Sequence, residues 1–139
     1  MQDQLEVITA NDAFYEALGR YDIDGMSEIW AKEPWVTCVH PGWKIIYGWE
    51  EIEESWRSIF NSEGRLEVSV SHAQVHLAGE YAWVICNENI STTLNKNFFR
   101  SNMQATNIFM KHQGRWLMVH HHASPIPEPE PQEFGDTVQ

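Results

Sequence analysis

The sequence has few basic residues, and it contains no long apolar run. It holds 9 Lys and Arg against 20 Asp and Glu, which gives a net charge of −11 at pH 7. This deficit of cationic side chains argues against a nucleic acid or an anionic membrane as partner, because both are bound through cationic surfaces. No apolar stretch approaches the roughly 18 residues of a membrane-spanning helix. The first residues, MQDQLEV, also lack the pattern of a signal peptide.

Cysteine is equally scarce, and so are the motifs of cofactor chemistry. Cys38 and Cys86 are too few for a disulfide framework. We therefore expect a soluble protein in the reducing cytoplasm. The sequence has no GxxxxGK[ST], GxGxxG, GxSxG, HExxH or CxxC motif, so we assign neither a cofactor nor a metal. The hydrophobic content of 42% with seven Trp is typical of a folded protein.

Proline and acidic residues collect at the C-terminal end. Residues 125–139 read PIPEPEPQEFGDTVQ and contain four of the six prolines, four acids and no basic residue. Alternating Pro and Glu form neither a helix nor an interior strand. The remaining length suits a single domain. We predict one domain over residues 1–124 and a solvated, mostly disordered tail at 125–139, with a docking peptide as the alternative interpretation of the tail.

Helical periodicity comes first along the chain, and strand-like segments follow. Helical spacing of apolar residues covers 5–21, a short second helix follows Asp22 or Asp24, and 49–60 is the clearest helix. A short strand is expected at 35–39, and four long strands are expected at 66–78, 81–94, 98–111 and 115–124. Turn residues separate the long strands, which indicates antiparallel pairing. The pattern predicts an α+β fold, with three N-terminal helices packed on a curved, mainly antiparallel sheet as a cone-shaped roll.

Polar residues interrupt two of the expected strands. Asn87, Glu88 and Asn89 break an apolar run, and strict alternation places Glu88 on the opposite face from the two asparagines. In the next strand Asn107 shares its face with apolar residues. A buried Asn needs a hydrogen-bond partner. These polar groups therefore line either a solvated or dimer-forming outer face, or a pocket in which Asn107 is an amide donor.

The last strand ends in three consecutive histidines. Alternation places His120 and His122 on one face and His121 on the other. They are interpreted as structural histidines, as pocket residues that act as acid, base or hydrogen-bond donor, or as a metal pair with a third ligand such as His40. Cys38 beside His40 could also be a nucleophile, although a buried Cys is usually inert.

Three segments carry a resemblance to a known family: VHPGW (39–43), GWEEIEESWRSIF (48–60) and GRWLMVHHHASP (114–125). With the order of the expected elements, the chain resembles the nuclear-transport-factor-two-like (NTF2-like) superfamily over roughly residues 4–125. It is most similar to the SnoaL-like, or polyketide-cyclase-like, branch. The resemblance implies an α+β cone with a pocket at its wide end and a homodimer joined through its sheets. It does not specify an activity, because this fold hosts many functions.

Within the superfamily, ketosteroid isomerase is a distant relative by this resemblance and offers a mechanistic comparison. Its base precedes a proline just after the first strand, which is the place of His40 before Pro41 here. Its protonated acid lies in the penultimate strand, where Asn107 is the nearest match. Its helical Tyr matches Phe14, whereas Tyr15 is one residue away and about 100° around the helix. The hydroxyl of that Tyr is therefore expected to be missing.

The sequence leads to two hypotheses. In the first, the protein binds a small apolar or aromatic carbonyl compound and transfers a proton on it as an isomerase, cyclase or lyase. His40 is the base, Asn107 a hydrogen-bond donor and His122 a second acid, base or orienting group. Further ligand contacts are expected from Tyr15, Trp30, Trp43, Asn87 and His120. In the second, the protein is a non-catalytic dimeric binding or assembly module, and Trp and Phe side chains fill the pocket.

Overall fold

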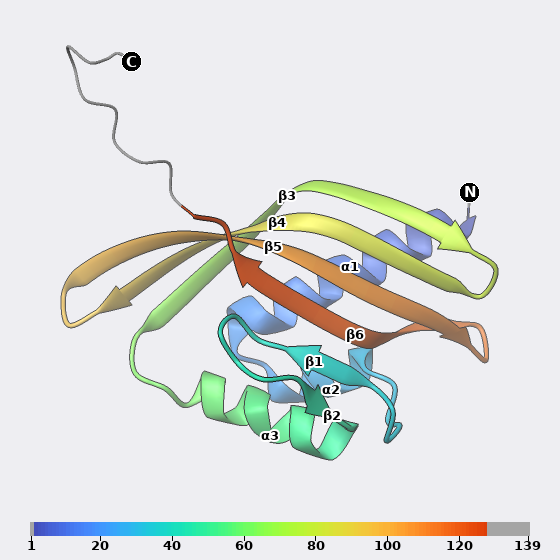
Figure 1. The fold of residues 1–139 in the computed structure, drawn as a ribbon, viewed down its shortest axis with the longest axis horizontal. Coiled ribbons are helices and arrows are strands. Elements are labelled where there is room, and N and C mark those ends of the chain that lie inside the picture. Colours follow the sequence, from blue (N-terminus) through green and yellow to red (C-terminus); the bar gives the residue numbers. More distant parts are fainter. Residues whose placement is uncertain (1, 128–139) are drawn as a thin grey trace, which may run out of the picture.

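The computed structural model describes residues 2–127 (Figure 1). Along the chain the elements are α1 (Gln2–Arg20), α2 (Ile23–Ile29), β1 (Thr37–Val39), β2 (Ile46–Tyr47), α3 (Trp49–Phe60), β3 (Arg65–Ala78), β4 (Tyr81–Leu94), β5 (Asn97–His112) and β6 (Arg115–Pro125). The three helices and the four long strands lie close to their expected positions. The predicted α+β roll is confirmed.

Local chemistry explains where the shorter helices begin. The side chain of Asp22 accepts a hydrogen bond from the backbone N–H of Gly25 at 3.0 Å, which caps α2 as the sequence suggested. Helix α3 has Glu50 and Glu51 in its first turn, where the helix dipole favours anions. Its opposite face buries Ile52 and Trp56. That apolar face fixes how α3 packs against the rest of the molecule.

The strands form a single six-stranded sheet in the order β2-β1-β6-β5-β4-β3. Neighbouring strands are antiparallel except β1 and β6, which pair in parallel. In Figure 1 the long strands arch over α1, and α2 and α3 lie on the same side of the sheet as α1. The β1–β2 pair extends the sheet beyond β6. The face of the sheet that turns toward the helices is called the inner face below, and the opposite one the outer face.

A β-bulge in β6 decides which histidine turns inward. Met118 pairs with Phe109 and His120 pairs with Ile108, so Val119 is an extra residue without a partner in β5. Met118, just before the bulge, is buried, and two residues after the bulge His121 is buried as well. Without the bulge, regular alternation from Met118 would have placed His120 and His122 inside.

The helices, the two cysteines and the C-terminal end of the sheet were each the subject of an expectation from the sequence. Among the described residues, none of the helices has both the length and the apolar character to cross a membrane. Cys38 and Cys86 are both buried and free. Strand β6 ends at Pro125, and the backbone N–H of Ile126 donates to the carbonyl of Asn102 at 2.8 Å. The rest of the predicted tail, 128–139, lies outside the described residues.

Candidate functional site

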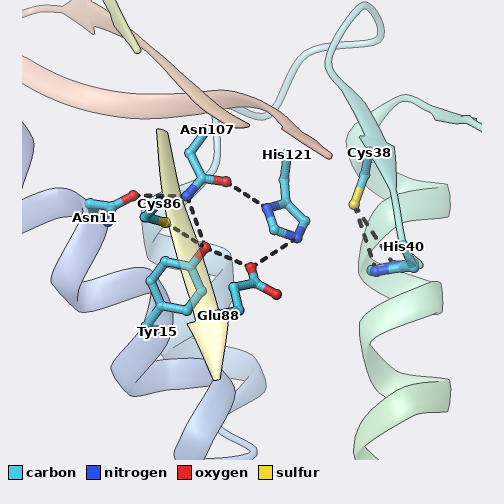
Figure 2. Close-up of polar contacts among 8 residues, drawn as sticks. All are labelled: Asn11, Tyr15, Cys38, His40, Cys86, Glu88, Asn107 and His121. Atoms are coloured by element: carbon cyan, nitrogen blue, oxygen red, sulfur yellow. Dashed lines mark hydrogen bonds and ion pairs between the residues drawn. The ribbon is translucent and has the colours of Figure 1, made fainter. Parts of the chain in front are cut away.

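Six polar side chains point into the core between the helices and the inner face of the sheet (Figure 2). They come from four elements that are distant in sequence, and all are buried. Together they are called the buried network: Asn11 and Tyr15 from α1, Cys86 and Glu88 from β4, Asn107 from β5 and His121 from β6. Polar groups removed from water are costly unless they are paired, so their partners matter.

Asn107 is fully buried and connects three members of the buried network. Its amide Nδ2 donates to Asn11 Oδ1 at 2.9 Å and to the hydroxyl of Tyr15 at 3.1 Å. Its Oδ1 lies 2.6 Å from His121 Nδ1. Because Oδ1 can only accept, the imidazole must donate from Nδ1–H. In the neutral imidazole, Nε2 of His121 then carries the lone pair.

Glu88 lies on the other side of that imidazole. Tyr15 donates its hydroxyl hydrogen to Glu88 Oε2 at 2.6 Å, and His121 Nε2 is 4.0 Å from the same oxygen. Burial raises the pKa of Glu88, although the hydrogen bond from Tyr15 opposes this rise. Burial also holds the pKa of His121 well below its usual value, and the neighbouring histidines add to the effect. These shifts favour an uncharged acid beside an uncharged base.

His40 occupies a second polar position in the core, just after β1. The hydroxyl of Ser55 donates to the carbonyl of Ile52 at 2.6 Å, so at 2.8 Å it accepts the Nε2–H of His40. Burial lowers the pKa of His40 to about 4. Cys38 Sγ lies 3.9 Å from His40 Nδ1, but burial raises the pKa of this thiol. A thiol held in its protonated form is a poor nucleophile.

Aromatic side chains fill the space between the two histidines. The ring of Trp56 is 4.6 Å from that of His40 and 6.0 Å from that of His121, measured between centroids. Phe14 packs on His121 at 4.8 Å. Trp43 contacts His40 at 4.8 Å and is 44% exposed. Five hollows lie on the described part of the chain, and none of them is lined by His40, His121 or Asn107.

The structure brings His40, Asn107 and Tyr15 into the core but not His122. Because of the bulge in β6, His122 is exposed on the outer face, and His121 is the residue that meets Asn107. The expectation that His122 acts as an acid, base or orienting group inside the pocket therefore has to be corrected. The hydroxyl of Tyr15 was expected to be missing from the core, and it is present.

The other expected ligand contacts are dispersed. Asn87 is half-buried on the outer face, where it pairs with Ser71 of β3 and with Gln104 of β5. His120 is also half-buried and faces outward, where its Nδ1 lies 2.6 Å from Thr37 Oγ1. Trp30 is buried against Trp49, with ring centroids 5.9 Å apart. Trp43, in contact with His40, remains beside the core site.

Glu88 and Asn11 are site residues that the sequence interpretation did not select. Glu88 follows Ala82, Val84 and Cys86 at alternate positions, and all three are buried. A carboxyl on an apolar strand face was therefore a visible signal. Asn11 likewise falls on the apolar stripe of α1, four residues after Val7, which is also buried.

Acid is expected to destabilise the protein through His40. Its pKa is about 4 in the folded protein but close to the ordinary 6.5 when unfolded. Between these values the unfolded chain binds more protons, so stability falls as the pH falls. From pH 7 to pH 5 the loss from this group is about 2 kcal/mol. Urea unfolding should show a smaller acid-induced loss for His40→Gln than for wild type.

The matched control is His112→Gln on the surface, which should keep the wild-type loss. Equal acid-induced losses in wild type and His40→Gln would contradict the burial of a neutral His40.

Known proteins resemble this chain over most of its length. Residues 7–129 match the family model of the SnoaL-like domain. The F-box protein SKIP8 of Arabidopsis thaliana is 28% identical over 118 residues, which are 85% of this chain and 48% of that protein. The chain thus spans about half the length of this curated relative.

Two solved structures share both fold and sequence with the chain. A candidate dehydratase of the NTF2-like family from Streptomyces avermitilis is 32% identical, with a TM-score of 0.84 over 91% of this chain and 98% of that one. A candidate calcium/calmodulin-dependent protein kinase type II association domain from Thiobacillus denitrificans is also 32% identical. Its TM-score is 0.71 over 85% of this chain and 93% of that one.

Proposed function

The chain belongs to the SnoaL-like domain family, and from this premise we propose that it binds a small apolar or aromatic carbonyl compound inside the roll and transfers a proton on it. The observation that carries the proposal is the pair of Glu88 and His121, a buried acid and a buried base whose Oε2 and Nε2 atoms lie 4.0 Å apart. Such pairs are typical of general acid–base sites. The reaction class is that of an isomerase, cyclase or lyase, without a cofactor.

Each member of the buried network has a role in the proposal. His121 Nε2 removes a proton from the carbon next to the carbonyl, and Asn107 holds that imidazole in the required tautomer. On binding, the hydroxyl of Tyr15 exchanges its acceptor Glu88 Oε2 for the carbonyl oxygen, and it donates there as negative charge develops. Glu88 protonates the resulting enolate to give the product, and the proton on His121 Nε2 then passes to Glu88 Oε2, 4.0 Å away, so that both groups return to their starting forms. Asn107 is a positioning residue, because both of its amide donors are already used within the network.

The magnitudes are those of a modest enzyme. A well-placed general base contributes about 10²–10⁴-fold, and one donor to a developing oxyanion contributes about 10²–10³-fold. His40 is the second imidazole of the core and remains a candidate base, with the lone pair on Nδ1, which lies 3.9 Å from Cys38 Sγ. A ligand would have to displace Trp56 or Trp43 to reach it, since these rings pack directly on His40.

The 32% identical relative named as a candidate dehydratase supports this class of chemistry. Loss of water from a hydroxy-carbonyl compound needs one group that removes a proton and another that protonates the departing oxygen. Glu88 and His121 supply both kinds of group.

Exchange of hydrogen for deuterium tests the proposal without a known substrate. In D₂O near pH 7, NMR follows uptake of deuterium at the carbons next to the carbonyl of 2-tetralone, a small aromatic ketone. Wild type should accelerate the uptake over buffer, and Glu88→Gln and His121→Gln should each lose about 10²-fold or more of that acceleration. Circular dichroism shows whether each variant is folded.

His122→Ala is the matched control, since its imidazole lies on the outer face, and it should keep the wild-type rate. The proposal fails if folded Glu88→Gln and His121→Gln exchange the ketone as fast as wild type.

The alternative is a non-catalytic dimeric binding or assembly module. Two observations favour it: Trp56 occupies the space between the two core histidines, and the Thiobacillus relative is named as an association domain. In this alternative the buried network only stabilises the fold, and none of its variants changes ketone exchange.

For either function we propose a homodimer through the outer face of the sheet. Part of that face is apolar, and Ile85 there is 43% exposed. Sedimentation equilibrium should give twice the chain mass of 16.2 kDa.

A further inference from the structure

Two histidines stand side by side on the outer face, away from the buried network. His120 and His122 are alternate residues of β6, so their side chains share one face. Their ring centroids are 6.1 Å apart, with the planes inclined at 71°. His122 is exposed and His120 is half-buried. Neither belongs to the proton-transfer site proposed above.

The spacing of the two rings suits chelation of one metal ion. Zinc binds imidazole nitrogens at about 2.0–2.1 Å, and two rings on a tetrahedral ion have centroids about 5 Å apart. The observed 6.1 Å is about 1 Å longer than that value, and His122, the exposed ring of the two, is the one that would turn on binding. A rigid strand thus holds the pair close to the geometry that a metal ion requires.

The second nitrogen of His120 already has a partner. Nδ1 lies 2.6 Å from the hydroxyl of Thr37 on the neighbouring strand β1. When Nδ1–H donates to that oxygen, Nε2 carries the lone pair that can bind a metal ion. Metal-binding histidines are usually oriented by such a hydrogen bond from the other ring nitrogen.

We propose that His120 and His122 chelate a divalent transition metal such as Zn²⁺, and that a second copy of the chain completes the site with the same two residues. The described residues of one chain contain no group of three or more His, Cys, Asp or Glu that could hold a metal, whereas structural zinc takes four ligands. This inference rests on the homodimer proposed above, in which two outer faces pack together.

The position of the pair fits a shared site. Strand β6 lies in the interior of the sheet order, and a twofold interface brings the same patch of each copy together. His122 also lines a hollow of about 270 Å³ on this face, with Ile85, Gln104, Ala105, Thr106 and Ser124. Four imidazoles, two from each copy, would then surround one ion.

Zinc titration of the full chain, purified without a histidine tag and freed of metal with a chelator, tests the site. Calorimetry should give one Zn²⁺ per two chains. Sedimentation should show a dimer dissociation constant at least about tenfold lower with Zn²⁺ than without. His120→Ala and His122→Ala should lose both effects, and Thr37→Val should weaken zinc binding by about 10–100-fold. His112→Ala, an exposed histidine outside the pair, should behave as wild type.

Absence of zinc binding, or equal binding by His122→Ala, would overturn the site. One Zn²⁺ per chain without an effect on the dimer would overturn the shared geometry. The ketone-exchange assay shows whether a failure of the zinc site is separate from a failure of the proposed enzyme function. The pair lies outside the buried network, so His120→Ala and His122→Ala should exchange 2-tetralone at the wild-type rate. Failure of exchange in wild type would refute the enzyme proposal and leave the zinc result unaffected.

Discussion

Replacement of Trp56 by alanine should lower the free energy of unfolding by about 3–5 kcal/mol, the usual cost of removing a large aromatic side chain from a core. Trp56 is only 2% exposed, and its ring contacts Phe14, Phe60 and both core histidines. Urea unfolding at pH 7 measures the loss. The surface variant Trp35→Ala, whose side chain is 50% exposed, should change stability far less.

The same variant should also open the core between His40 and His121. A cavity left by a large aromatic side chain can bind a small aromatic molecule of similar shape. Indole added to Trp56→Ala should therefore bind and restore part of the lost stability, whereas wild type should show no such gain. A folded Trp56→Ala protein that is as stable as wild type, or that indole does not stabilise, would contradict this description of the core.

Replacement of Asn107 by leucine should be nearly as damaging, although leucine has a similar size. It removes the partners of Asn11 Oδ1 and His121 Nδ1 and one partner of the Tyr15 hydroxyl. Each buried polar group left unpaired costs about 1–3 kcal/mol. We expect a loss of at least about 3 kcal/mol in urea unfolding.

Nitrogen-15 NMR of the imidazoles adds a measurement that stability alone does not provide. In wild type His121 should be the Nδ1–H tautomer, held by Asn107 Oδ1, and the variant should lose that preference. Asn102→Leu, on the exposed part of the same strand, is the control for both measurements. If Asn107→Leu kept the tautomer and lost less than about 1 kcal/mol, Asn107 would not be the centre of the network.

These two residues show why the core supports two functional hypotheses. Trp56 makes the interior dense, which is what a purely structural core requires. Asn107 organises polar groups that an inert core would not need, and it leaves the lone pair of His121 Nε2 directed toward Glu88. Dense packing and an organised polar network are compatible with ligand binding when an aromatic side chain moves aside during binding.

Much of the fold could be predicted from the sequence, because local patterns carry it. Helix α3 has the bounds that its apolar spacing and acidic first turn indicated, and the four long strands follow the positions of their turn residues. Of the short pair at the edge of the sheet, the sequence predicted β1 but not β2. The parallel pairing of β1 with β6 joins segments about 80 residues apart, and no local pattern encodes such a contact.

Part of the candidate site was also visible. His40 before Pro41 and Asn107 within an apolar strand were selected, and both are buried in the core. Alternation separated Glu88 from Asn87, but the sequence interpretation chose Asn87 as the ligand contact, whereas the structure buries Glu88. His122 was chosen where His121 is found, because one extra residue, Val119, changes which side chains of β6 turn inward.

The sequence by itself determined the α+β class, the three helices, the four long strands and the polar residues available for chemistry, since these follow from periodicity and turn propensity. The tertiary structure alone decided which of them meet. It turned His121 inward and left His120 and His122 as an outer pair. It brought Asn11, Tyr15, Glu88 and Asn107 together with His121 across four elements. It also set the protonation states, because desolvation and tautomer choice depend on neighbours that only folding brings together.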